Sequence, residues 1–265
     1  MRITSHKRES LYCEFHRIQL KTINYNEMKT TKLLFTLVLS LVTCIGMASD
    51  GNSDKTETRN VNNFKGIKVS TGIDLYIRMG TVEEVKIVAD DDIIDDLITE
   101  VKDGTLKIYM KQSNNWFNWN SGNQTRKAYV TVKELQEIHA SSGSDVQSEN
   151  TLNGESLKVS ASSGSDVTLD IHYKNFSLDA SSGSDAKISG KTKNFEAEAS
   201  SGSDIKAQDL ESTICKINVS SGSDASVNVT DELYAKASSG ADVRYYGNPQ
   251  VKDIDESSGG DVSNK

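Results

Sequence analysis

The chain has 265 residues and a formal net charge of −8, from 38 acidic and 30 basic residues. Binding to a nucleic-acid backbone depends on Lys and Arg, which neutralise its phosphates. An acidic chain of this kind is therefore not expected to bind nucleic acid.

The first expected element is a secretory signal peptide at residues 28–48. It starts at a methionine, continues with a short basic region and an apolar run of 13 residues, and ends in small residues that favour cleavage after Ala48. Because a bilayer crossing needs about 20 apolar residues, this run is too short for a membrane span. We interpret residues 1–27 as an upstream extension from a start assigned too early, and residues 49–60 as a linker. In an alternative interpretation, Cys44 belongs to a lipobox-like sequence and anchors the mature chain through a lipid.

Removal of residues 1–48 makes the chain more acidic. It takes away 7 of the 30 basic and 3 of the 38 acidic residues, which leaves 23 against 35 and a net charge of −12. It also leaves Cys215 as the one cysteine, so no internal disulfide can form in an oxidising compartment. We expect an exported protein of the periplasm, the outer-membrane surface or the medium, with no transmembrane span in its mature chain.

Residues 61–135 are expected to form an N-terminal cap and the first irregular coils of a repeat protein. Apolar residues alternate with polar ones, as in Ile73, Leu75 and Ile77, and this is the period of a β-strand. Residues 90–101 fit one short amphipathic helix. Repeat proteins need such atypical ends to cover their cores.

Both tryptophans of the chain lie in a segment rich in Asn and Ser at residues 112–123. Flat aromatic faces beside amide groups suit stacking on sugars or the capture of a partner's apolar residue. Trp116, Phe117 and Trp119 are therefore candidate ligand-binding residues. The alternative is that these side chains cover an open end of the repeat array.

Residues 136–262 contain a five-residue sequence that recurs seven times. It reads Ser-Ser-Gly-Ser-Asp, with Ala or Gly as the fourth residue in the last two copies, and its aspartates are 18 to 21 residues apart. Apolar residues alternate between the copies, and no helical period occurs. A strand, a corner and another strand in about 19 residues are typical of one turn of a β-solenoid. The sequence therefore predicts an all-β fold, a single parallel β-helix with coils of about 19 residues.

The alternation also predicts side-chain directions at each corner. If Ala161 and Val167 both face the core, Ser163 and Ser165 point inward and Asp166 points outward. The fourth position of the motif accepts Ala and Gly, so we expect a narrow core edge that tolerates no larger residue. We expect the corner glycine to take a positive φ or to allow close backbone approach at the bend, and Cys215 to be a small buried hydrophobic residue.

The corner aspartates are expected to form one line, because coils stack at about 4.8 Å. Like charges at that distance repel, so each carboxylate needs a compensating partner. We favour hydrogen bonds from N–H and Ser hydroxyl groups of the corner, and we expect no cofactor. The alternative is Ca²⁺ bound between coils, since Gly-Ser-Asp is similar to part of the calcium-binding nonapeptide repeat. The candidate metal ligands in that case are Asp145, Asp166, Asp185, Asp204, Asp224, Asp242 and Asp261.

The order of these features resembles a known family. Residues 64–69 (Phe-Lys-Gly-Ile-Lys-Val), 72–75 (Gly-Ile-Asp-Leu) and 103–108 (Asp-Gly-Thr-Leu-Lys-Ile) precede the serial corners. This order is similar to the putative auto-transporter adhesin, head GIN domain family, whose members are exported proteins common in Bacteroidetes. Asp74 stands in place of the asparagine of the Gly-Ile-Asn signature. The resemblance implies a right-handed β-helix with an irregular N-terminal cap.

Together, these features favour a non-enzymatic surface or periplasmic module that binds a cell-surface glycan or protein. The alternatives are a polysaccharide-processing β-helix enzyme and a calcium-stabilised structural rod. An enzyme of that kind needs two carboxylates in different environments, or a carboxylate close to Lys, Arg or His. The corner carboxylates are equivalent from coil to coil, so no residue is assigned a catalytic role.

Overall fold

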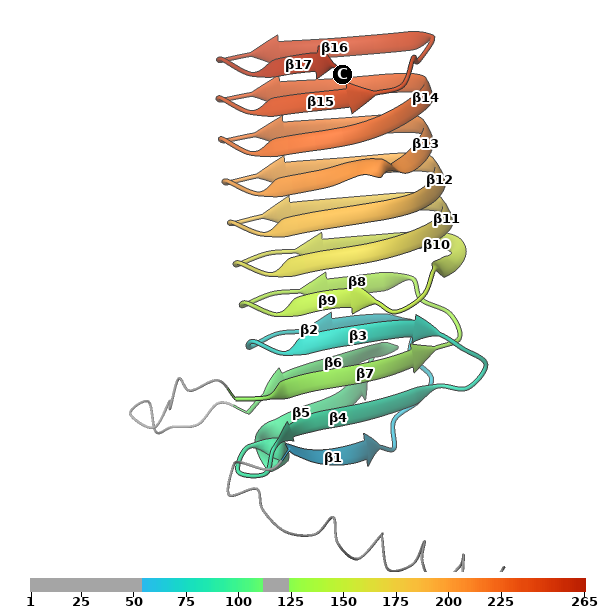
Figure 1. Cartoon of the computed structure of the whole chain (residues 1–265), viewed down its shortest axis with the longest axis vertical. Helices are drawn as coiled ribbons and strands as arrows, with labels where there is room; N and C mark the ends of the chain where they lie inside the picture. The colour runs from blue at the N-terminus through green and yellow to red at the C-terminus, as the bar shows by residue number, and fades with distance from the viewer. Residues whose placement is uncertain (1–53, 112–123) are drawn as a thin grey trace, which may run out of the picture. The chain divides into compact units, whose positions relative to one another are not determined.

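A computed structural model describes residues 54–111 and 124–265 of the chain. In these ranges the protein is all-β, with 17 strands and one short 3-10 helix, η1, at Ile94–Asp96. The strands stack as the successive coils of a solenoid (Figure 1). None of the described segments is a helix long and apolar enough to cross a membrane.

In the regular part of the solenoid, from β11 to β14, one strand occupies a whole coil, from the aspartate of one corner to the first serine of the next. Each coil pairs in parallel with the following one. The front halves run to the right and the back halves return to the left as the coils rise, which makes the solenoid right-handed (Figure 1). The strands are β8 (Glu137–Ala140), β9 (Asp145–Ser148), β10 (Leu152–Ala161), β11 (Asp166–Ser181), β12 (Asp185–Ser200), β13 (Asp204–Ser220), β14 (Asp224–Ser238), β15 (Asp242–Tyr246), β16 (Val251–Ser257) and β17 (Asp261–Asn264).

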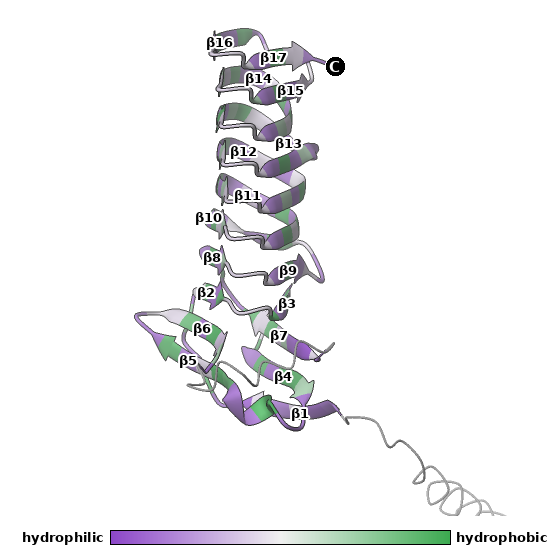
Figure 2. Ribbon diagram, turned by 90° about the vertical axis from the view of Figure 1, so that its left-hand side faces the viewer, coloured by the Kyte–Doolittle hydropathy of each residue, from purple (hydrophilic) through white to green (hydrophobic). Residues whose placement is uncertain are grey.

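The core of each coil is formed by residues that alternate along the strand, and the outward positions between them are mostly polar (Figure 2). On β11, Val167, Leu169 and Ile171 point inward from the front half and Phe176 from the back half, and all four are buried. Because equivalent positions pair between coils, equivalent side chains stack along the axis. The rings of Phe176 and Phe195 are stacked with their centroids 5.4 Å apart.

The N-terminal cap differs from the regular coils in the order of its strands. Strands β2 and β3 form a coil that pairs with β6 and β7 on one side and with β8 and β9 on the other. Strand β4 is antiparallel to both β1 and β7, and β5 is antiparallel to β6. The sequence predicts an irregular cap but not this order. The cap strands are β1 (Asp54–Arg59), β2 (Gly66–Val69), β3 (Asp74–Met79), β4 (Glu84–Asp90), β5 (Leu97–Lys102), β6 (Thr105–Met110) and β7 (Arg126–Val132).

Two segments of the cap differ from the expectations. Strand β1 lies inside the segment interpreted as a linker and pairs along its full length with β4. Residues 90–101 do not form an amphipathic helix, because the chain passes from η1 directly into β5. Ile98 and Val101 lie in this strand and pair with β6. Their β-branched side chains fit a pleated sheet better than a helix.

Each corner departs from simple alternation. Its second serine and its glycine both take left-handed backbone conformations, and at Ser163 and Gly164 φ is 56° and 68°. Ser165 is buried and Asp166 is exposed, as predicted, but Ser163 is exposed, so the expectation that it points inward is wrong. Two consecutive left-handed residues carry the chain away from the core before it returns at Ser165. Since a left-handed L-residue costs roughly 1–2 kcal/mol, other interactions must hold the corner in this conformation.

The buried serine of the corner supplies such interactions. Ser184 Oγ accepts a hydrogen bond from the Ser181 N–H of its own corner (3.0 Å) and donates one to the Ala161 carbonyl of the preceding coil (2.9 Å). Ser165 and Ser203 make the same two hydrogen bonds in their coils. Each hydroxyl therefore closes its corner and joins it to the neighbouring coil, at a place where water is excluded.

Replacing Ser184 with leucine is expected to lower the free energy of unfolding by about 1–3 kcal/mol, because the narrow core edge has no room for the larger side chain. The matched control is Lys187→Leu, which changes an exposed position of β12 close to the same corner and should have little effect. Chemical denaturation of the two variants measures the difference. Equal losses of stability in both would contradict the inward assignment of Ser184.

Candidate functional site

The corner aspartates lie side by side along the solenoid, as predicted. Asp166 pairs in register with Asp145 on one side and Asp185 on the other. The pairing continues through the later corners as far as Asp261. Strand β3 adds one more member, because Leu75 pairs with Val146 and so places Asp74 next to Asp145. Asp74 in turn pairs with Lys127 of β7, so this row of carboxylates meets a cation at its N-terminal end.

Crowding of like charges affects the carboxylate near that end of the row. Burial, followed by the charges of Asp166 and Asp74, raises the pKa of the Asp145 carboxyl, while a hydrogen bond from the Asp166 main chain acts in the opposite direction. Further along the row, Lys206 Nζ lies 3.2 Å from Asp185 Oδ2. This contact raises the pKa of Lys206. Cations on the adjacent outward positions thus offset part of the repulsion.

The serine hydroxyls of the corner have a different role from the one expected. The buried ones bond to main-chain groups. The carboxylates are paired with cations instead: Lys206 also lies 3.6 Å from Asp204, and Arg244 lies 3.3 Å from Asp242. Within the two described ranges, no group of three or more His, Cys, Asp and Glu side chains is placed to hold a metal ion. Calcium between the coils stays an untested alternative.

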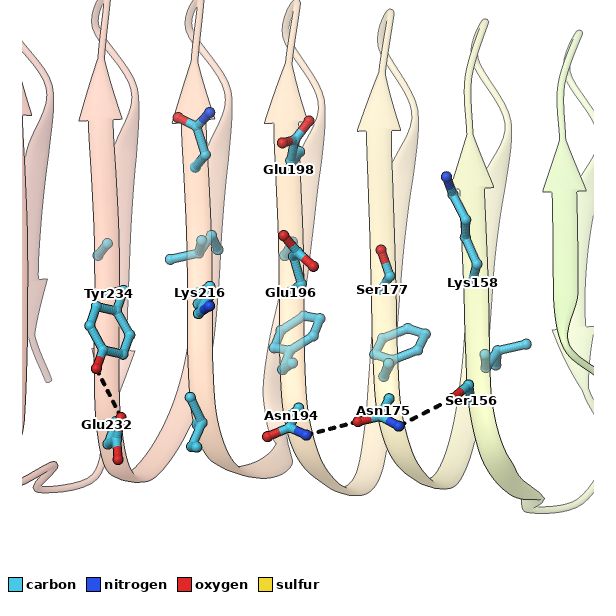
Figure 3. Close-up of a pocket in the computed structure, with 18 of the residues that line it drawn as sticks. Ser156, Lys158, Asn175, Ser177, Asn194, Glu196, Glu198, Lys216, Glu232 and Tyr234 are labelled. Carbon is cyan, nitrogen blue, oxygen red and sulfur yellow. Dashed lines mark hydrogen bonds between the residues drawn. The ribbon is translucent and has the colours of Figure 1, made fainter.

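A groove of about 1240 Å³ lies on the outer face of the opposite sheet, which is built from the back halves of the coils (Figure 3). It extends along the solenoid over β10, β11, β12, β13, β14 and β16. We call it the back groove. Register places its outward side chains in columns that run along the axis, one residue for each coil.

The first column begins with a chain of hydrogen bonds. Asn194 Nδ2 donates to Asn175 Oδ1 (2.8 Å), and Asn175 Nδ2 donates to Ser156 Oγ (3.2 Å) and to the Glu155 carbonyl (3.4 Å). Figure 3 shows these side chains in a line across three strands. The hydrogen bonds fix the orientation of the amides, while both asparagine side chains stay partly accessible to solvent. Such preoriented amides can bind a polar ligand with little further loss of side-chain freedom.

The C-terminal half of the groove contains an aromatic group. The Tyr234 hydroxyl donates a hydrogen bond to Glu232 Oε2 (2.9 Å), which holds the ring along its strand. Lys216 Nζ lies 5.9 Å from the centroid of this ring. Ile214 lies in the first column between Asn194 and Glu232. This half therefore offers an aromatic face and an aliphatic side chain beside charged groups.

The groove is acidic. Its lining contains seven carboxylates and three lysines, a difference of four negative charges. Lys158 and Lys236 are paired with Asp179 and Asp255. By contrast, the lining residues Glu196, Glu198 and Asp253 make no ion pair with any other described residue. Three carboxylates thus face solvent, ready to attract a cationic ligand and to repel an anionic one.

The residues predicted from the sequence as sites are not those of the back groove. Trp116, Phe117 and Trp119 lie outside the described residues. The corner aspartates belong to the edge between the two sheets, where the front halves of the coils begin. The groove was missed because its columns become visible only once the register is known, although the 19-residue separation of Asn175 and Asn194 matches the repeat.

Cys215 is fully buried, as the sequence predicts. Burial raises the pKa of its thiol to about 12, so it is protonated at neutral pH and unsuited to act as a nucleophile or a metal ligand. It packs as a small hydrophobic residue in the core.

Comparison with known sequences places the chain in a family. Residues 63–249 match the profile described as putative auto-transporter adhesin, head GIN domain. The chain belongs to this family. The match covers most of the cap and six of the seven corners, so the resemblance seen in the sequence is confirmed. A search of curated proteins finds no match.

Several solved structures are similar to this fold. A putative adhesin from Bacteroides fragilis has a TM-score of 0.75 at 20% identity, covering 83% of this chain and 100% of that chain. A putative adhesin from Parabacteroides merdae has a TM-score of 0.64 at 16% identity, with 82% and 98% covered. A putative lipid binding protein from Parabacteroides distasonis has a TM-score of 0.63 at 19% identity, with 82% and 99% covered. At these identities the likeness concerns the fold alone.

The aspartate row predicts opposite effects of one substitution at two equivalent corners. Asp145→Asn should raise the melting temperature at pH 7, because it removes a carboxylate crowded by like charges. Asp185→Asn should lower it, because Lys206 loses the nearer of its two ion-pair partners, although exposed pairs are worth at most about 1 kcal/mol. Thermal denaturation followed by circular dichroism compares the two variants with the unchanged chain.

The gain in Asp145→Asn should depend on pH. A raised pKa means that the folded state binds this proton more tightly than the unfolded chain, so stability falls as pH rises through and above the usual value of 3.8. The advantage of Asp145→Asn should therefore be present at neutral pH and vanish below that value. Shifts of the same sign in both variants at pH 7 would contradict this account of the row.

Proposed function

We propose that the protein is an exported, non-enzymatic adhesion module that acts at the cell surface or in the periplasm and holds its ligand in the back groove. The observation that carries this proposal is the groove itself, which extends over six strands and is lined by oriented polar side chains. The adhesin description of the family agrees with it.

The shape of the groove favours an elongated ligand. Its residues recur coil by coil along the axis, so a ligand that extends in this direction gains one set of contacts for each coil. Several weak contacts of this kind add up to a useful affinity.

The Parabacteroides distasonis neighbour is named as lipid binding, but an acyl chain in this groove would contact amides and carboxylates, which favours a polar ligand instead.

Polysaccharide cleavage is the competing function. It requires a general acid and a base or nucleophile in different environments. Glu196 and Glu198 lie two residues apart on one face of β12 and are both exposed. His139 Nε2 lies 2.8 Å from Glu137 Oε1, and His139 is not among the residues that line the groove. The proposal therefore assigns the two groove glutamates to recognition and predicts that a bound glycan is left intact.

Adhesion of the full chain, coated on beads, to bacterial and host cells tests the proposal. Asn194→Ala combined with Tyr234→Ala should reduce bead retention by about tenfold, equivalent to 1.4 kcal/mol. The matched control combines Gln147→Ala with Tyr76→Ala, an amide and a tyrosine at outward positions of the front sheet, and should adhere normally.

Melting temperatures of both double variants show whether each is folded. Normal adhesion by the folded groove variant would refute the role of the groove. Release of new reducing ends from the cell-surface glycans by the unchanged chain would show that the protein is an enzyme.

A further inference from the structure

The columns of the back groove have a fixed period along the axis. Ser156, Asn175 and Asn194 occupy paired positions of three successive coils. Paired strands are about 4.8 Å apart, so hydrogen-bonding groups recur at that interval. The next column repeats the interval through Lys158, Ser177 and the coils that follow. A polymer that lies along the groove meets equivalent positions only if its own repeat is close to this spacing.

The spacing discriminates between classes of polymer. Residues on one face of an extended peptide recur about every 6.6 Å, twice the rise per residue of a β-strand. They would therefore not stay aligned with columns whose spacing is that of the coils. The main chain under the groove is already paired with neighbouring coils on both sides, so a peptide cannot add as another strand. An extended chain of β-1,4-linked pyranoses advances by nearly one coil spacing for each sugar, and because successive sugars are turned over, the same face returns at nearly every second coil. Its equatorial hydroxyl groups can donate to and accept from the amides.

The side chains suit the two kinds of surface that such a sugar presents. The Asn column and Ser177 provide donors and acceptors for hydroxyl groups at one end of the groove. Tyr234 and Ile214 provide aromatic and aliphatic contact for the apolar face of a ring at the other end. A glycan that runs along the axis contacts both ends.

The negative charge of the groove further limits the classes of sugar that it can bind. Glu196 and Glu198 are exposed, and neither makes an ion pair within the described ranges. Uronic acids and sulfated sugars would place negative charges beside them, whereas an amino sugar would place an ammonium group there. Neutral sugars fit without a charge contact.

We infer that the back groove binds an extended β-1,4-linked glycan of amino or neutral sugars, with its long axis along the solenoid and one sugar for each coil. This inference rests on the proposed function and names the ligand of the same groove. Because the groove covers six strands, affinity should increase with oligosaccharide length up to about six sugars.

Titration calorimetry of the full chain with three hexasaccharides tests the inference. The probes are a β-1,4-linked glucosamine hexamer, cellohexaose and a β-1,4-linked mannuronate hexamer. The glucosamine hexamer should bind most tightly, cellohexaose should bind more weakly, and the mannuronate hexamer should not bind. Cellobiose should bind at least about tenfold more weakly than cellohexaose.

Two groove variants separate the contributions of hydrogen bonds and charge. Asn175→Ala combined with Asn194→Ala should weaken the binding of glucosamine and glucose hexamers alike, by about tenfold. Glu196→Gln combined with Glu198→Gln should remove the preference for the glucosamine hexamer over cellohexaose. Gln147→Ala on the front sheet is the control and should change neither.

The outcomes separate this inference from the proposed function. Equal binding of the mannuronate hexamer, or no dependence on length, would overturn the inference. So would glucosamine and cellohexaose binding that is unaffected in a folded Asn175→Ala, Asn194→Ala variant. If none of the hexamers binds while adhesion to cells still depends on Asn194 and Tyr234, the inference fails and the proposed function stands.

Discussion

Parallel backbone pairing between successive coils, held in strict register at the corners, determines almost every other property of this protein. It places each residue on its equivalent in the next coil, as Asp166 on Asp185 and Phe176 on Phe195. The same geometry is favourable for stacked rings in the core and unfavourable for stacked charges at the corner. Lysine and arginine at neighbouring outward positions offset part of this repulsion.

The register itself depends on the corner. A left-handed backbone conformation is costly for the second serine of the corner. The buried serine after the glycine compensates through hydrogen bonds within its corner and to the preceding coil. Unequal coil lengths are absorbed elsewhere. Strand β13 shifts its register against both neighbours, after Lys187 on one side and after Ala207 on the other, while the corners stay aligned. The irregular pairing caused by the extra residues therefore lies along β13, away from the corners.

The sequence predicts those parts of the fold that follow from local pattern and period. The repeated corner and the alternation are enough for the solenoid, the inward Ser165 and the row of aspartates. Ser163 was placed wrongly because alternation assumes extended backbone, and the corner is left-handed at that residue. The order of the cap strands follows from long-range pairing, which has no local signal. The back groove depends on which side chains share a column. Ser156, Asn175 and Asn194 follow the period of the repeat, but the coils after them differ in length, so only the register shows that Ile214 and Glu232 continue the same column.

Strands β2 and β3 lie between strands that all follow them in the sequence, and this order matters while the chain is being synthesised. This first coil needs partners on both sides, and both are made later, since β7 ends at Val132 and β9 at Ser148. Until β6 is made, β2 has no parallel neighbour, and until β7 and β9 are made, β3 has unpaired edges, a state that favours association with other chains. Chaperone protection is therefore needed most while the first hundred or so residues of the solenoid are still being made.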